Sequence, residues 1–173
     1  MARNTMGFDF GLDDPNVCFK RKNRWLFVIT DVSADTELNS LPPSKSARPS
    51  LSFKEIEAQH LNETIYFPGK PEWKPVSLTL YETKHGDLHP VFKWLQQVYD
   101  PSEGGESKYK PSCDGFKKRD AKLELYDGCG KILETWVYEG IWPQSVEFGD
   151  LDMTSSDVIT CDLTLRYDRA YIK

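Results

Sequence analysis

The sequence predicts a mainly β protein of the α+β class, built as a β-sandwich or half-barrel with one flanking helix. Seven segments have the two-residue apolar–polar period of a strand or are rich in β-branched and aromatic residues. Only one segment has a helical period. The chain has 173 residues, which fits a single domain over residues 1–173. A domain of this length buries roughly 70% of its unfolded surface, so it needs no disulfide or metal to fold.

The strand pattern is clearest in the last third of the chain. There, the sequence Asp127-Gly128-Cys129-Gly130 predicts a tight turn between two strands. Residues 158–167 alternate strictly, with one face carrying Ile159, Cys161, Leu163, Leu165 and Tyr167. The predicted strands cover residues 24–32, 51–58, 61–67, 76–82, 121–126, 131–139 and 158–167.

The second predicted strand breaks its own alternation. Leu51 and Phe53 share one face, whereas Ile56 falls on the other, which predicts a β-bulge near Lys54 and Glu55. The strand after it mixes apolar and acidic residues on one face, and such a face is not ordinary core. By contrast, the strand over residues 76–82 alternates cleanly and is expected to bury its apolar positions Val76, Leu78 and Leu80.

The single predicted helix covers residues 88–99. Its apolar residues have the spacing i, i+3, i+4, i+7, which makes one stripe for core packing; they are Val91, Trp94, Leu95 and Val98. Asp87 or His89 is expected to cap the helix, and Pro90 suits its first turn because the missing N–H is not needed there.

Three long segments lack any period. Residues 1–23 are expected to form an N-terminal arm that either folds back on its own domain or docks on another copy. Residues 33–50 and 100–118 are expected to be long polar loops that contact neighbouring subunits. Unstructured connections longer than about 12–15 residues are uncommon in compact domains and are usually functional or disordered.

Composition and charge exclude several classes of protein. The net charge is −5 and the pI is about 5.3. No basic stripe is present, which disfavours tight nucleic-acid binding. The longest apolar run, residues 25–29, is far shorter than the ~20 residues of a membrane-spanning helix. Because the N-terminus does not resemble a signal peptide, we expect folding in the cytoplasm.

The four cysteines show neither CxxC spacing nor a zinc-ligand pattern. They are Cys18, Cys113, Cys129 and Cys161. Two alternatives stay open: four free thiols, as is usual in a reducing compartment, or cross-links between neighbouring subunits after release into an oxidising medium.

The residues give no support for catalysis. His85 and His89 straddle Gly86 and a helix start, so they do not form a metal-gripping helix face. Asp150 and Asp152 lie in a polar loop, where solvated carboxylates are the default interpretation. The sequence contains no nucleophile elbow, P-loop or dinucleotide fingerprint. We therefore expect a structural protein with no catalytic residue, metal or cofactor.

Several segments resemble, in order, the tail tube proteins of contractile-tailed bacteriophages. The most specific is the corner formed by Gly140, Ile141, Trp142 and Pro143 between two alternating strands. The supporting segments are residues 118–122, 136–143 and 160–167, the turn at residues 40–42, the pair Pro68-Gly69 with Trp73 ahead of a strand, and the helix at residues 91–98. The match covers about residues 25–167 and departs from the family's pattern in the arm and in the turn at Cys129.

The resemblance implies a hexameric ring in which each copy adds strands to one shared inner β-barrel. Such a barrel also satisfies the exposed strand edges that the alternating segments predict. Rings would stack into a tube, inside a contractile sheath, through which genomic DNA passes without specific binding. The implied partners are the tail sheath protein and the baseplate and tail terminator proteins. The implied location is the virion tail, assembled in the host cytoplasm.

Two sets of residues are assigned on this basis. The acidic residues expected to line the bore are Glu55, Glu57, Glu63 and Asp162, because acidic walls repel DNA phosphate and let it slide. The residues expected to bridge stacked rings are Pro42, Pro43, Lys45 and Arg48.

Two rival functions are kept. The first is the tube of a bacterial contractile injection or secretion system, which would carry cargo other than DNA. The more remote one is a carbohydrate-binding β-sandwich, suggested by the five tryptophans, with Trp73 as the freest platform.

Overall fold

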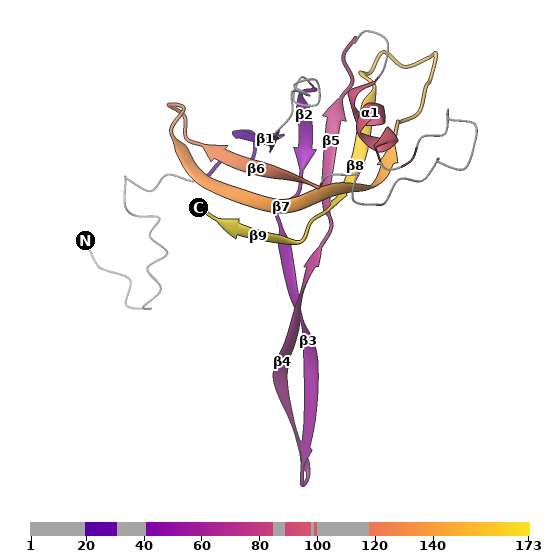
Figure 1. Ribbon diagram of the computed structural model, residues 1–173. Coiled ribbons are helices and arrows are strands. Elements are labelled where there is room, and N and C mark those ends of the chain that lie inside the picture. The colour runs from indigo at the N-terminus through magenta and orange to yellow at the C-terminus, as the bar shows by residue number, and fades with distance from the viewer. Residues whose placement is uncertain (1–19, 31–40, 85–88, 98, 100–117) are drawn as a thin grey trace, which may run out of the picture.

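The computed structural model describes residues 20–30, 41–84, 89–97, 99 and 118–173. This part of the chain is mostly strand with one short helix (Figure 1). The strands are β1 (Trp25–Thr30), β2 (Pro43–Ser46), β3 (Ser50–His60), β4 (Glu63–Lys74), β5 (Val76–Tyr81), β6 (Arg119–Tyr126), β7 (Ile132–Glu147), β8 (Thr160–Arg166) and β9 (Arg169–Ile172). The helix is α1 (Pro90–Gln96).

Seven strands form the body of the molecule. They pair antiparallel in the order β1-β6-β7-β8-β5-β2, and β9 pairs with β7 beside this path. The two end strands of the order, β1 and β2, contact each other, so the sheet curls round on itself. This arrangement confirms the predicted fold class, a half-barrel with one helix against it.

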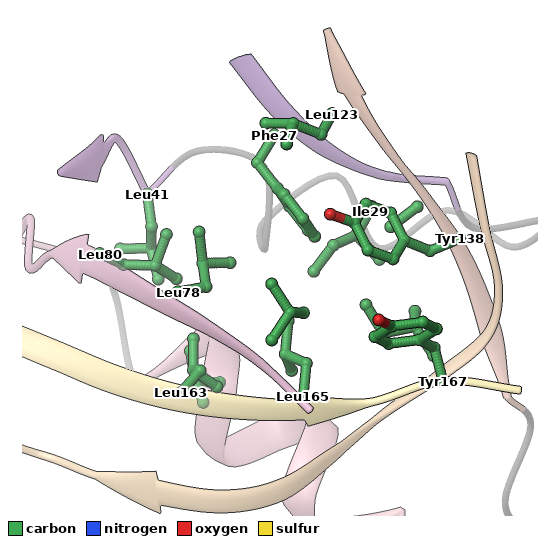
Figure 2. Close-up of a cluster of buried hydrophobic side chains, with 14 of the residues drawn as sticks. Phe27, Ile29, Leu41, Leu78, Leu80, Leu123, Tyr138, Leu163, Leu165 and Tyr167 are labelled. Atoms are coloured by element: carbon green, nitrogen blue, oxygen red, sulfur yellow. The ribbon is translucent and has the colours of Figure 1, made fainter. Parts of the chain in front are cut away.

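The core fills the inside of the curled sheet (Figure 2). Val76, Leu78 and Leu80 of β5 face Leu165, Leu163 and Cys161 of β8, and all six are buried. In the other half, Tyr138 packs edge-on against Tyr167 with ring centroids 5.1 Å apart. The predicted alternation is confirmed for these strands, because burial of one face of a sheet selects a period of two.

The helix covers one end of this core. His89 is its N-cap, with Nδ1 accepting from the Val91 N–H at 3.3 Å. Val91 and Trp94 are buried, as predicted, whereas Leu95 is only half-buried. The buried Arg119 guanidinium lies 5.3 Å from the Trp94 ring centroid, which joins the helix to β6. Asp87 and Val98 lie outside the described residues.

The main differences from the predicted strand boundaries lie at four places. The strand predicted over residues 61–67 is β4, which continues to Lys74 because it pairs with the whole of β3. β2 lies inside residues 33–50, where we expected only a loop, because its backbone pairs with β5 without any apolar period. β9 was missed, since four residues are too few for a pattern and the strand forms by pairing with β7. β7 was predicted to end at residue 139, but it continues to Glu147 by changing partners.

Candidate functional site

The hairpin of β3 and β4 projects away from the body (Figure 1). Its two strands, of 11 and 12 residues, form a sheet of their own and pair with no other strand in the described part of the chain. A two-stranded hairpin without a partner surface is only marginally stable in water. Within the described residues, no other strand supplies such a surface to this hairpin.

Large apolar side chains on the hairpin are exposed in the single chain. Phe53 is 59% exposed, Ile56 54% and Phe67 50%. Leu51, Leu61, Ile65 and Tyr66 are exposed as well. Exposed apolar side chains gathered on one element mark an interaction surface. The hairpin is therefore a candidate interaction surface.

A β-bulge divides the hairpin into a base and a tip. Phe53 pairs with Pro71 but Glu55 pairs with Pro68, so β4 holds one more residue than β3 between these two pairs. The bulge was predicted at this level, but its extra residue lies on β4 rather than β3. A Cβ on Gly69 would lie 2.6 Å from the Lys54 carbonyl oxygen, so this close approach requires glycine.

The register places apolar residues on opposite faces of the base and the tip. In the base, the pairs Leu51–Trp73 and Phe53–Pro71 share one face, and Trp73 packs against the body core. In the tip, the pairs Ile56–Phe67 and Ala58–Ile65 occupy the other face, because side chains alternate along β3. The hairpin therefore offers apolar contacts on both of its faces.

The four acids expected to line the bore are not all brought together. Glu55 and Glu57 lie on the same face of β3, opposite Pro68 and Tyr66. Glu63 begins β4 and lies on the other face, the one that carries the apolar tip residues. At the tip, the register therefore places Glu55 and Glu57 on one face and the apolar residues, together with Glu63, on the other.

Asp162 lies in the body rather than on the hairpin. It is on the solvent-facing side of β8, where the Thr79 hydroxyl donates to its carboxylate. Glu147 is its cross-strand neighbour on β7. Glu147 therefore adds a second carboxylate beside Asp162. It was missed in the sequence because residues 140–147 were not predicted to continue the strand.

The Gly140–Pro143 corner is the point where β7 passes from one half of the body to the other. Up to Ile141 it pairs with β6, and from Trp142 onward it pairs with β8. Gly140 has a φ of 66°, and its N–H donates to the Asp120 carboxylate at 3.2 Å. Ile141 and Pro143 are buried. The corner therefore orients the two halves of the sheet relative to each other.

The residues expected to bridge rings lie on and beside β2. Pro43 and Lys45 belong to the strand itself, whereas the Pro42 carbonyl accepts from the Tyr81 N–H at 2.9 Å. Arg48 lies between β2 and β3 and is exposed. This segment is fixed to β5 on one side, and its role between rings stays a prediction.

The cysteines differ in what they can react with. Cys161 is fully buried, and burial raises the pKa of its thiol to about 11, which favours the alternative of a free thiol at this residue over a cross-link. Cys129 is exposed in the turn between β6 and β7, where the Asp127 carboxylate accepts from its N–H at 2.7 Å. Cys18 and Cys113 lie outside the described residues.

Within the described ranges, no group of three or more His, Cys, Asp or Glu side chains is placed to hold a metal ion. Hydrogen bonds from Thr154 to the Asp152 carboxylate lower the pKa of that group, which is the opposite of what a general acid at neutral pH requires. No helix of the described residues is long and apolar enough to cross a membrane.

Comparison with known proteins identifies one family and several solved structures that share the fold of this chain. The family described as T4-like virus tail tube protein gp19 matches residues 35–170. A tail tube protein of Serratia phage KSP90 is 28% identical over 159 residues, covering 87% of each chain.

Solved structures share the fold. A chain of the PVC extracellular contractile injection system, from its sheath–tube complex in the extended state, has a TM-score of 0.64 at 18% identity and covers 99% of both chains. A chain of the anti-feeding prophage baseplate has a TM-score of 0.66 at 14% identity, covering 91% of this chain and 97% of its own length.

Proposed function

This chain belongs to the T4-like virus tail tube protein gp19 family, and we propose that its copies form hexameric rings that stack into the inner tube of a virion tail. The hairpin β3–β4 is the observation that carries the proposal. It is a long ribbon with apolar side chains on both faces, and further copies of the chain are the partners that a self-assembling tube supplies.

The energetics favour docking of the hairpin. Fully burying a large apolar side chain contributes about 1.5–3 kcal/mol. Phe53, Ile56 and Phe67 are each about half exposed, so covering them contributes on the order of 1 kcal/mol each. In a closed ring every copy gives one hairpin and receives another, and the contribution is repeated at every interface.

The acidic face of the hairpin tip suits the wall of a DNA conduit. DNA carries one charge per ~1.7 Å of helix axis and binds surfaces that offer Lys and Arg. Glu55 and Glu57 lie side by side on the face of the tip opposite Ile56 and Phe67. We assign this face to the bore, where the carboxylates repel phosphate and DNA passes without specific binding.

Glu63 takes a different role in this proposal, because it begins β4 on the apolar face of the tip. We assign it to the boundary of the hairpin contact between copies. Asp162, on the body sheet, keeps its assignment to the bore together with its neighbour Glu147.

The remaining surfaces are assigned to the other partners. The arm at residues 1–23 and the segments 33–50 and 100–118 contact neighbouring copies, and the segment with Pro42, Pro43, Lys45 and Arg48 contacts the next ring. The outer side of α1 faces a contractile sheath. Baseplate and terminator proteins bind the two ends of the tube. The protein assembles in the host cytoplasm and has no enzymatic activity.

The experiment compares purified wild-type protein with an Ile56→Asp/Phe67→Asp variant in negative-stain electron microscopy. Wild type is expected to form rings or hollow rods of even bore at high concentration, and the variant is expected to stay monomeric. Both side chains lie outside the body core, so the thermal unfolding of the variant body should match wild type. The matched control is Thr64→Asp/Tyr66→Asp, which adds the same two negative charges on the opposite face and should still assemble. A wild-type protein that stays monomeric at every concentration would refute the proposal.

A second candidate is the tube of a contractile injection system that carries no DNA. The similarity in fold to the PVC chain favours keeping it. Particles purified from the producing cells distinguish the two, because only a phage tail is joined to a DNA-filled capsid.

A further inference from the structure

A basic cavity of about 410 Å³ opens between β1 and β2, the two ends of the body sheet. Five of its ten lining residues are basic and none is acidic. The basic residues are Lys20, Arg21, Lys22, Lys45 and Arg48. These five basic residues gather around one cavity although the whole chain carries a net charge of −5.

Glu134 is the acidic residue that acts on this group of charges among the described residues, since both Lys20 and Arg48 lower the pKa of its carboxyl group. Lys20 forms an ion pair with Glu134 and lowers the pKa of that carboxyl group. In the described part of the chain, the other four basic residues form no ion pair. Like charges gathered around one cavity repel each other, so an anionic group placed there is stabilised by all of them.

The inner wall of the cavity is apolar. Trp25, Leu123 and Leu125 line it, and the two leucines belong to the body core. A phosphate alone would leave this wall uncovered. The cavity therefore fits a polypeptide segment that carries both carboxylates and large apolar side chains.

The loop between β7 and β8 has this composition. Residues 148–159 contain Asp150, Asp152 and Asp157, with no Lys, Arg or His. Between and beside the carboxylates, Leu151 is 81% exposed and Met153 is fully exposed. Met adapts its shape to irregular apolar surfaces. The loop therefore presents acidic and apolar groups together at its tip.

The loop is held in shape by its own side chains. The Asp152 carboxylate accepts from the Thr154 N–H at 2.8 Å and from the Thr154 hydroxyl at 2.7 Å. The Ser155 hydroxyl donates to the Asp157 carboxylate at 2.9 Å. A segment that is already ordered loses less conformational entropy when it binds.

In Figure 1 the loop lies beside α1, whereas the strands β1 and β2, between which the cavity opens, lie on the other side of β5. A copy therefore presents its loop to a neighbour rather than to its own cavity. We propose that the acidic loop at residues 148–159 of one copy inserts into the basic β1–β2 cavity of the next copy. A head-to-tail contact generates a ring when its rotation closes, and the ring of the proposed tube function, on which the inference rests, requires such closure.

The first test exchanges the charges of the two surfaces. One variant carries Lys45→Glu/Arg48→Glu in the cavity, and the other carries Asp150→Lys/Asp157→Lys in the loop. Both keep Asp152, which orders the loop. Each variant alone is expected to need at least about tenfold more protein to form rods, because each reverses two attractive charges on one side of the contact. An equimolar mixture should form rods at the wild-type concentration, because the introduced glutamates can then face the introduced lysines, while the unmutated cavity of one variant meets the unmutated loop of the other.

A control variant, Lys84→Glu/Lys173→Glu, has the same net charge change as the cavity variant at exposed positions outside both surfaces. It should assemble like wild type. The inference is overturned if the cavity variant also assembles like wild type, or if the mixture does not restore assembly. A cavity variant that assembles normally but loses affinity for a DNA oligonucleotide would assign the cavity to phosphate instead.

A second test separates failure of this contact from failure of the tube. A photo-cross-linking residue is placed at Leu151, and the cross-linked peptides are identified by mass spectrometry. Cross-links to residues 20–25 or 44–48 of another copy support the contact whether or not rods form. Rods whose cross-links map elsewhere overturn the contact and leave the tube standing. Cross-links from the cavity to residues 1–19 would show that the arm fills it, which also overturns the inference.

Discussion

Substitution of Gly140 by alanine tests how the corner of β7 holds the two halves of the body together. Gly140 has a φ of 66°, in the left-handed region that disfavours residues with a Cβ. A Cβ there would also lie 2.9 Å from the Asp168 carboxyl carbon. Asp168 in turn forms an ion pair with Lys118, with a shortest N–O distance of 2.7 Å. The substitution therefore perturbs both the backbone and one ion pair.

The expected loss of stability is about 2 kcal/mol. Placing alanine in the left-handed region costs roughly 1–2 kcal/mol, and the reduced entropy of the unfolded chain offsets about 0.4–1 kcal/mol of this. Moving the Asp168 side chain out of its rotamer costs about 1 kcal/mol. Its ion pair with Lys118 is half exposed and contributes at most about 1 kcal/mol.

Gly130 provides the matched control. Its φ is 83°, but no described atom lies within 4 Å of a Cβ built there. Gly130→Ala should therefore cost only the backbone part, about 0.5 kcal/mol. The difference between the two variants measures the contact with Asp168, and Asp168→Ala in the Gly140→Ala background should recover most of that difference.

The assay is urea unfolding of the unassembled protein, followed by tryptophan fluorescence. For a chain of this length, each kcal/mol also shifts Tm by about 2–4 °C, which gives an independent reading. The reasoning is refuted if the two glycine variants differ by less than about 0.3 kcal/mol, or if Asp168→Ala restores nothing.

Three further predictions follow from other surfaces. Glu55→Lys/Glu57→Lys should leave assembly intact and slow DNA delivery from infecting particles by at least about tenfold, because cations bind phosphate. Glu63→Lys, on the opposite face of the hairpin, should leave delivery rates unchanged, and equal slowing would contradict the assigned bore face. In a variant with Ser at the other three cysteines, Cys161 should resist maleimide in the native protein at pH 8, because burial raises its pKa to about 11; rapid labelling would contradict its burial. Asp127→Ala should lower the unfolding midpoint at pH 7, because hydrogen bonds from the Lys131 and Cys129 N–H groups depress the folded pKa of Asp127. A carboxyl whose pKa is depressed stabilises the fold above its unfolded value, so this difference should vanish as the pH falls below about 4; a pH-independent difference would refute it.

The sequence by itself determined the elements whose faces differ in polarity. The alternation of β5, β6 and β8 and the apolar spacing in α1 specified which side chains enter the core, because burial of one face imposes a period on the sequence. The His89 cap was predicted as one of two alternatives, and the Gly140–Pro143 corner was predicted from its residues. The resemblance to tail tube proteins also came from sequence alone.

Only the tertiary structure decided features that depend on pairing between distant segments. The extra residue of the bulge lies on β4 rather than β3. At the tip, the pairing of His60 with Glu63 places Glu63 on the opposite face from Glu55 and Glu57. The strands β2 and β9 exist because β5 and β7 offer them backbone partners, and backbone hydrogen bonding leaves no pattern in short polar sequences. The basic cavity joins residues 20–22 to residues 45–48 and β6. These charges are far apart in sequence and come together only when the sheet curls, so the local sequence pattern cannot predict the cavity.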